Sequence, residues 1–117
     1  MKILRGHLYI VDFEPRIHTK PGKSRPAVVI QSDLVNEAGY PSTVVVPTTT
    51  QVIDNAGFLR LRLQKGLCGL EKESDLLMGQ MIAVANLSFK KDLGALPKDL
   101  FQELIKRVSL LLDIGDI

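Results

Sequence analysis

Residues 21–30 read PGKSRPAVVI, and this stretch carries the chain from a polar loop into an apolar strand. The Pro-Gly pair is typical of a turn. Residues 25–31 (RPAVVIQ) are rich in β-branched side chains, which favours a short buried strand. Pro26 must stand near the beginning of that strand, because a proline in its middle would remove a hydrogen-bond donor from the ladder. The pattern therefore predicts Arg25 at the junction between a cation-rich loop and a buried strand.

A second buried strand is predicted at residues 43–47 (TVVVP), which Pro47 is expected to end. Three adjacent threonines, at positions 48–50, follow at its exit. Short buried strands that follow each other in sequence usually lie side by side. We therefore expect Arg25 and Thr49 to converge at one end of a sheet. The alternative explanation for the threonines, taken alone, is ordinary turn formation.

The rest of the chain predicts further strands and one long helix. Residues 58–63 (FLRLRL) alternate, so that Leu59, Leu61 and Leu63 face the core and the two arginines face the other side. The C-terminal segment repeats apolar residues at helical spacing after Pro97, which suits a first helical position. The other expected elements are a strand at 6–13, a loop at 14–24, a polar connection with a short helical turn at 33–40, one or two strands bent at Gly79 within 74–85, and a short helix at 87–92.

The composition predicts a single globular domain spanning residues 1–117. The chain is 45% hydrophobic and 24% charged, with a net charge of +2, which is ordinary for such a domain. Short strands without long alternating helices favour a mainly β fold, an antiparallel sheet or small barrel that carries the C-terminal helix. Cys68 is the only cysteine, so an intramolecular disulfide is excluded and a cytoplasmic location is expected. We recognise no signal peptide, no membrane span and no metal-ligand spacing.

Residues 16–25 form a basic segment with five potential cations and no acidic residue. Such a segment attracts phosphate groups electrostatically, and the alternative is a solvated loop that keeps the domain soluble. A guanidinium at position 25 offers planar donors to a phosphate, and a hydroxyl at position 49 can hold developing negative charge. His18 titrates near neutral pH and can therefore move a proton. The five cations are Arg16, His18, Lys20, Lys23 and Arg25.

Short motifs occur in order along nearly the whole chain. They are Arg5-Gly6-x-Leu8-Tyr9, Asp12-Phe13-x-Pro15, Gly22-Lys23-x-Arg25-Pro26 with Val28-Val29-Ile30, Ser32-Asp33, Thr43 to Pro47 with Thr49, Gly69-Leu70 with Lys72 and Ser74, Gln80, and Leu93-Gly94-x-Leu96. Each motif is weak alone, but the set is specific in its order and spacing. Together the motifs resemble the MazF/PemK/Kid family of toxin endoribonucleases.

This resemblance implies an SH3-like barrel with a C-terminal helix, working as a homodimer. It implies cleavage of single-stranded RNA without metal or cofactor, in which the 2′-hydroxyl attacks the adjacent phosphate, and a cognate antitoxin that covers the RNA groove. The family's catalytic arginine and threonine fall on Arg25 and Thr49, and the base proposed for the Kid branch falls on His18. The residues expected to contact RNA are Arg16, Lys20, Lys23, Thr48, Thr50, Ser74 and Gln80.

The sequence departs from the family pattern on part of the expected RNA surface. His7 stands where an acid is usual, and Leu77 and Gly79 stand where the Kid branch has an arginine and an aspartate. Apolar Met81 and Ile82 follow Gln80. Two alternatives therefore stay open: a non-cleaving toxin of the same fold, like the gyrase poison CcdB, and a degenerate member that binds an antitoxin but does not cut RNA.

The homodimer implied by the resemblance would reuse one patch on both subunits. We expect residues 69–78 and part of the C-terminal helix to contribute, because their apolar side chains exceed what one small barrel can bury. The basic segment at 16–25, with Arg60 or Arg62, is expected to make the resulting groove cationic.

Overall fold

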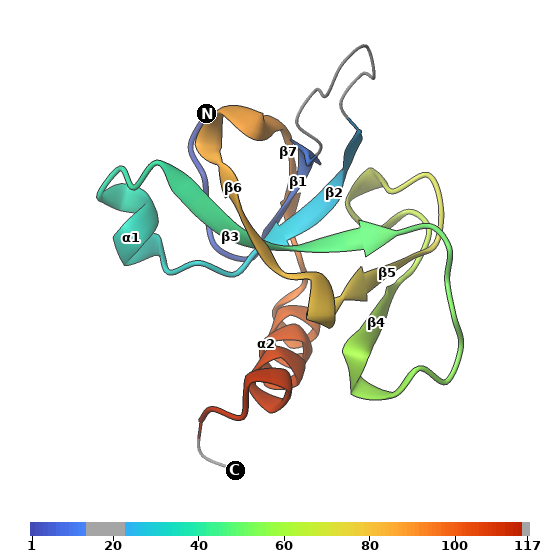
Figure 1. Cartoon of the computed structure of the whole chain (residues 1–117). Helices are drawn as coiled ribbons and strands as arrows, with labels where there is room; N and C mark the ends of the chain where they lie inside the picture. The colour runs from blue at the N-terminus through green and yellow to red at the C-terminus, as the bar shows by residue number, and fades with distance from the viewer. Residues whose placement is uncertain (14–22, 116–117) are drawn as a thin grey trace, which may run out of the picture.

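The computed structural model describes residues 1–13 and 23–115. Its strands form one antiparallel sheet of seven strands, with a long helix against it (Figure 1). In chain order the helices and strands are β1 (His7–Asp12), β2 (Ser24–Val29), α1 (Asp33–Glu37), β3 (Ser42–Thr49), β4 (Arg60–Leu63), β5 (Ser74–Leu77), β6 (Ile82–Ala85), β7 (Phe89–Ala95) and α2 (Lys98–Leu112). Short 3₁₀ turns precede β4, β6 and β7, and another lies between β4 and β5.

The strand order is β4-β5-β3-β2-β1-β7, and β6 pairs with the first half of β3. The expected antiparallel β architecture with a C-terminal helix is confirmed. Among the described strands β4 and β7 are the two ends of this order, so the sheet is not closed. None of the helices within residues 1–13 and 23–115 is long and apolar enough to cross a membrane.

The uninterrupted apolar runs of β2 and β3 are explained by burial on both faces of the sheet. Successive residues of a strand point to opposite faces. Val28 and Val46 join a core cluster that includes Leu104 of α2, whereas Val29 and Val45 join a second cluster on the other face. Alternate residues of each run therefore face the side of the sheet that α2 covers, and the residues between them face the other side.

Pro47 does not end its strand, contrary to the sequence prediction, because β3 runs on to Thr49. Val45 is the last residue of β3 opposite β6, and Thr48 is the first opposite β5. The carbonyl of Val44 accepts from Ile30 on the β2 side, so the polar groups of residue 47 point to the other side, where β3 changes partner. The proline therefore removes no ladder bond.

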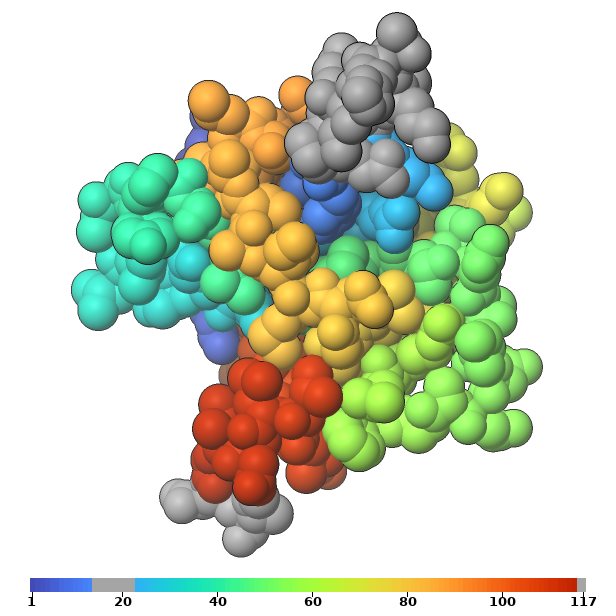
Figure 2. Space-filling model, viewed as in Figure 1, coloured from blue at the N-terminus to red at the C-terminus, as the bar shows by residue number. Residues whose placement is uncertain are grey.

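The prediction for residues 58–63 is right only in its second half. β4 begins at Arg60, and residues 57–59 form a 3₁₀ turn. Leu61 and Leu63 are buried as expected, but Leu59 is exposed because it lies in this turn rather than on the strand. Figure 2 shows the segment around this turn beside α2 on the lower part of the molecule.

The short helix predicted at residues 87–92 is wrong. A 3₁₀ turn at Asn86–Ser88 leads directly into β7. β7 pairs with β1, and the buried ring of Phe89 packs edge-on against Tyr9 with the ring centroids 5.2 Å apart. This long-range packing outweighs the local pattern. The remaining predicted elements within the described residues are confirmed, including the bend at Gly79 between β5 and β6.

Candidate functional site

Arg25 and Thr49 lie at the same end of the sheet, as predicted. β2 and β3 are antiparallel, with Val28 opposite Val46 and Ala27 opposite Pro47. Extending this register by two residues brings Arg25 opposite Thr49. Both residues line one depression of about 390 Å³, which is walled by residues 23–26 and 48–51. The predicted convergence is therefore confirmed, while the chemical roles of the two residues stay predictions.

Arg25 is half-buried and is supported by an aromatic ring that directly follows the neighbouring strand β1. Its guanidinium carbon lies 6.0 Å from the centre of the Phe13 ring, at the outer limit of a cation–π contact. Val11 of β1 is the residue opposite Arg25, and Phe13 lies two positions further along, on the same face. Sequence reasoning included Phe13 in a motif but gave it no role. The alternation of β1 is the signal that could have assigned it.

The three threonines have three different environments. Thr48 is buried, and its hydroxyl donates to the carbonyl of Pro26 at 2.7 Å. This bond joins β3 to β2 at the proline, so the hydroxyl proton of Thr48 is used within the fold. Thr49 is half-buried, and its Oγ1 accepts a hydrogen bond from the backbone N–H of Gln51 at 3.1 Å. The Thr49 hydroxyl therefore keeps its own proton available for an acceptor in the depression. Thr50 is exposed.

A second depression of about 430 Å³ continues from the first and shares Pro26 and Thr50 with it. Its walls are mostly apolar, and its charged lining residues are two lysines, Lys72 and Lys91, and one carboxylate, Glu71. Ser74 also lines it, although its buried hydroxyl donates to the carbonyl of Lys72 at 3.1 Å. The apolar lining residues are Ile10, Pro26, Leu70 and Leu93. Together the two depressions form a continuous polar and apolar surface around one end of the sheet.

The structure does not bring every predicted RNA-contacting residue to this place. Lys23 is exposed and lines the depression of Arg25 and Thr49. Gln80 is exposed in the 3₁₀ turn before β6 and lines neither depression. Arg16, His18 and Lys20 lie outside the described residues.

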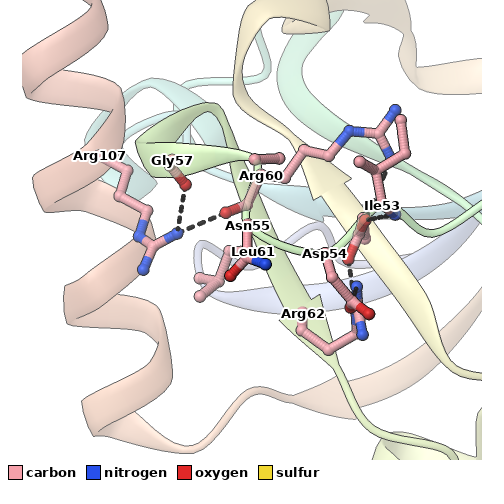
Figure 3. A pocket seen from close by; sticks show the side chains of 10 residues that line it. Ile53, Asp54, Asn55, Gly57, Arg60, Leu61, Arg62 and Arg107 are labelled. Carbon is pink, nitrogen blue, oxygen red and sulfur yellow. Dashed lines mark hydrogen bonds and ion pairs between the residues drawn. The ribbon is translucent and has the colours of Figure 1, made fainter.

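Arg60 and Arg62 do not supply the cationic groove that was expected of them, because they are held by carboxylates. Asp75 of β5 is 1% exposed, and its two carboxylate oxygens accept from Arg60 Nη1 at 3.0 Å and from Arg62 Nε at 2.6 Å. Arg62 also pairs with Glu73 at 2.8 Å and with Asp54 at 2.9 Å. Figure 3 shows Asp54 facing Arg62. These two arginines are therefore part of an ion cluster on β4 and β5.

The pKa values of this cluster follow from its hydrogen bonds. Burial opposes ionisation of Asp75, but the hydrogen bonds from Arg62, from the backbone N–H of Ile53 and from Arg60 outweigh burial, and the pKa of Asp75 is lowered. The hydrogen bonds to Asp75 and Asp54 raise the pKa of Arg62 above its usual value. Asp75 is thus a charged, fully paired carboxylate. Sequence reasoning missed it because its partners are set by the register of β4 on β5, which places it opposite Arg62.

The reason given for a dimer contribution of residues 69–78, an excess of apolar side chains, is wrong. Leu70, Leu76 and Met78 are all buried in the core of a single chain, where they pack in the same cluster as Leu104 and Val108 of α2. The helix therefore covers the apolar surface that was expected from the sequence to be in excess.

No group of three or more potential metal ligands is formed by the residues in 1–13 and 23–115.

Comparison with known proteins gives a family for this chain. Residues 4–112 match the family described as PemK-like, MazF-like toxin of type II toxin–antitoxin system. Endoribonuclease EndoA of Bacillus subtilis is 28% identical over 81 residues, which are 69% of each protein.

Solved structures show the same fold. The crystal structure of MazE-MazF from Deinococcus radiodurans aligns with a TM-score of 0.80 at 20% identity, covering 98% of this chain and 99% of that one. An endoribonuclease in complex with its cognate antitoxin from Mycobacterial species aligns with a TM-score of 0.76 at 12% identity, covering 98% and 99%. Because the family match spans nearly the whole sequence, this chain belongs to the PemK-like, MazF-like toxin family.

Proposed function

We propose that this toxin-family protein is an endoribonuclease that cleaves single-stranded RNA and so inhibits translation and growth. The observation that carries the proposal is the shared depression of Arg25 and Thr49, in which a planar cation and a hydroxyl donor face one solvent-open space. The similarity to an endoribonuclease of Bacillus subtilis supports the same reaction class.

In the proposed reaction the 2′-hydroxyl oxygen of one nucleotide attacks the adjacent phosphorus, and the bond from phosphorus to the 5′-oxygen of the next nucleotide breaks. The products are a 2′,3′-cyclic phosphate and a free 5′-hydroxyl. Negative charge gathers on the phosphoryl oxygens in the transition state. Arg25 offers its N–H donors to those oxygens, and Thr49 donates its hydroxyl proton to one of them.

Two proton transfers accompany this step. The 2′-hydroxyl must lose a proton and the departing 5′-oxygen must gain one. Arginine is a poor proton carrier because its pKa exceeds about 12. We therefore assign both transfers to His18 of the basic segment, which accepts the proton of the 2′-hydroxyl and gives it to the departing 5′-oxygen.

Some of the proposed substrate contacts lie in the two depressions. Lys23 and Thr50 lie around the scissile phosphate, and the second depression, which includes Ser74, takes a neighbouring nucleotide on its apolar walls. Arg16, Lys20, Thr48 and Gln80 complete the set proposed to contact RNA. Of these, Thr48 is proposed to contact RNA through its backbone, because its hydroxyl donates to the carbonyl of Pro26.

We also propose a cognate antitoxin, a homodimer and a cytoplasmic location. The structures of relatives with antitoxins support the first. For the dimer, three apolar side chains exposed to 41–56% on and after α2 support a contribution of this helix: Leu110, Leu112 and Ile114. An acidic, disordered antitoxin segment that covers the basic segment and the depression would compete with RNA.

The test is incubation of the purified protein with a long mixed-sequence RNA, with and without EDTA. We expect cleavage in both cases, with 5′-hydroxyl and cyclic phosphate ends, and loss of cleavage in Arg25→Ala. Intact RNA together with gyrase inhibition would instead favour the CcdB-like alternative. Intact RNA together with tight antitoxin binding would favour the degenerate member.

A further inference from the structure

We propose that Asp75 is a positioning residue for Thr49, which it holds through Arg60 and the backbone of residues 51–53. This inference rests on the proposed function, since it assigns Asp75 a part in the reaction of Thr49. Asp75 itself does not line the depression of Arg25 and Thr49. It lines a separate hollow between β4 and α2, so it acts through other groups and does not touch the substrate.

The orientation of the Thr49 hydroxyl depends on the backbone two residues later. The N–H of Gln51 donates to Thr49 Oγ1 at 3.1 Å. This bond uses a lone pair of the hydroxyl oxygen, so the hydroxyl proton is directed away from Gln51, toward an acceptor. If the backbone at Gln51 moved, Thr49 would lose the contact that selects this orientation.

Arg60 holds that backbone in place. Its Nη1 donates to the carbonyl of Gln51 at 3.0 Å and to Asp75 Oδ2 at 3.0 Å. The same carboxylate oxygen accepts from the backbone N–H of Ile53 at 3.0 Å. The segment after Thr49 is therefore bound to Asp75 at two points, directly at Ile53 and through Arg60 at Gln51.

Asp75 is well placed to act as a fixed reference for this segment. It is the residue of β5 opposite Thr49 in the sheet register, and its side chain is 1% exposed. Its other oxygen is held by Arg62 Nε at 2.6 Å. A buried carboxylate with every contact satisfied keeps one geometry, because moving it would leave charge unpaired.

The far end of the same segment is held by α2. Figure 3 shows Arg107 reaching the carbonyls of Gly57 and Arg60, and Arg107 is itself paired with Glu103 at 2.7 Å. Residues 51–60 are thus tied to β5 near their start and to the helix at their end. A general fold-stabilising role of the cluster does not require its links to Gln51 and Ile53, and these links distinguish the positioning role.

The chain offers a matched control for this role. Glu73 belongs to the same ion cluster, where it pairs with Arg62 at 2.8 Å, but in the described part of the chain it makes no hydrogen bond to Gln51, Ile53 or Arg60. Glu73→Gln therefore removes a charge from the cluster and leaves the link to Thr49 intact. Asp75→Asn and Arg60→Met each interrupt that link, and Arg60→Met keeps the Asp75–Arg62 pair.

The first measurement does not depend on activity. Amide hydrogen exchange at Gln51 reports the N–H that bonds Thr49. We expect exchange at Gln51 to become faster in Asp75→Asn and in Arg60→Met, and to be unchanged in Glu73→Gln. Unchanged exchange in both link variants would overturn the proposal, whether or not the protein cleaves RNA.

The second measurement is a double-mutant cycle in RNA cleavage. We expect Asp75→Asn to lower kcat by roughly 10- to 100-fold with little change in KM, and to have less than about a twofold effect in a Thr49→Ala background. If Asp75→Asn does not fold, Arg60→Met is used in the same cycle. Equal losses with and without Thr49 would overturn the positioning role, while a wild-type protein that leaves RNA intact would refute the proposed function instead.

Discussion

On the two sides of the Thr49 end of β3, arginines lie in opposite surroundings. On the β2 side, the guanidinium of Arg25 lies over the ring of Phe13 and lines an open depression. On the β5 side, Asp75 engages Arg60 and Arg62 in a cluster of carboxylates. An aromatic face leaves the in-plane N–H donors of a guanidinium directed elsewhere, whereas a carboxylate uses them.

The comparison teaches that an arginine in an alternating strand is not in itself a binding residue. Both regions look cationic in the sequence, but in the structure only the Arg25 side presents its arginine in a depression together with a hydroxyl donor. On the other side, Asp75 and Arg60 bind the backbone of residues 51–53. We call Arg25, Thr49 and their depression the reacting region, and Asp75 with its arginine partners the holding region. The following predictions test this division.

The largest expected effect is on catalysis at the reacting region. Arg25→Ala should lower the single-turnover rate of RNA cleavage by roughly 10²–10³-fold, because it removes the group proposed as the main donor to the transition-state phosphate. Its thermal unfolding midpoint should stay close to that of the wild type, since the side chain is only half-buried. Cleavage within tenfold of the wild-type rate would show that Arg25 is not the reacting arginine.

The matching change at the holding region should act on stability. Asp75→Ala should reduce the free energy of unfolding by about 3 kcal/mol, because it leaves two arginines facing each other without their shared carboxylate. Urea denaturation of Asp75→Ala and Arg25→Ala side by side measures the contrast. If both variants unfold at the wild-type midpoint, the cluster does not hold the fold.

The pH dependence of cleavage should identify the proton carrier. His18→Gln should lower the rate by on the order of tenfold or more and remove the limb of the pH–rate profile with an apparent pKa near about 6–7. The measurement is kcat/KM between acid and alkaline pH for both proteins. A profile that keeps its shape would move the role to another group, with His7 as the next candidate.

Acid should weaken the ion cluster around Asp75. The pKa of Asp75 is lower in the folded protein than in the unfolded chain, because the hydrogen bonds from Arg62, Ile53 and Arg60 outweigh its burial. Its ionised form therefore contributes stability above the unfolded pKa of about 4, and this contribution is lost as the pH falls through the folded pKa. Asp75→Asn should flatten that acid dependence in a series of urea unfolding curves. An equally steep curve in the variant would assign the acid sensitivity to other carboxylates.

The smallest effect is expected on the salt dependence of RNA binding. Lys23→Gln should reduce the slope of log affinity against log salt by about 1, because the exposed ammonium is proposed to contact a phosphate. Arg62→Gln should leave the slope unchanged, since its charge is already paired with carboxylates. Equal changes of slope in the two variants would contradict the predicted difference in electrostatics between the two regions.

Much of the reacting region could be predicted from local patterns. Arg25 and Thr49 each stand beside an apolar run, and adjacent short strands pair in most sheets. That general rule was enough to place both residues at one end of the sheet. The role of Phe13 was not predicted, because an aromatic residue two positions after a buried valine is typical of a strand. Nothing in that pattern indicates a contact with an arginine on the neighbouring strand.

The holding region could not be predicted in the same way. The alternation of Arg60 and Arg62 indicates a polar face correctly, but it says nothing of what that face meets. Asp75 becomes their partner only because β5 lies antiparallel to β4 with Asp75 opposite Arg62. The helix predicted at 87–92 failed for a related reason, since the pairing of β7 with β1 overrides a weak local preference.

The sequence by itself determined the two-sided burial of β2 and β3, the amphipathic C-terminal helix and the meeting of Arg25 with Thr49, because these depend on side-chain periodicity and on short-range pairing. Only the tertiary structure decided that the sheet stays open, that Pro47 lies inside β3, and that the arginines of β4 belong to Asp75. Those outcomes depend on strand register and on changes of partner between segments far apart in the chain. A shift of one residue in register would turn Asp75 to the opposite face and away from both arginines.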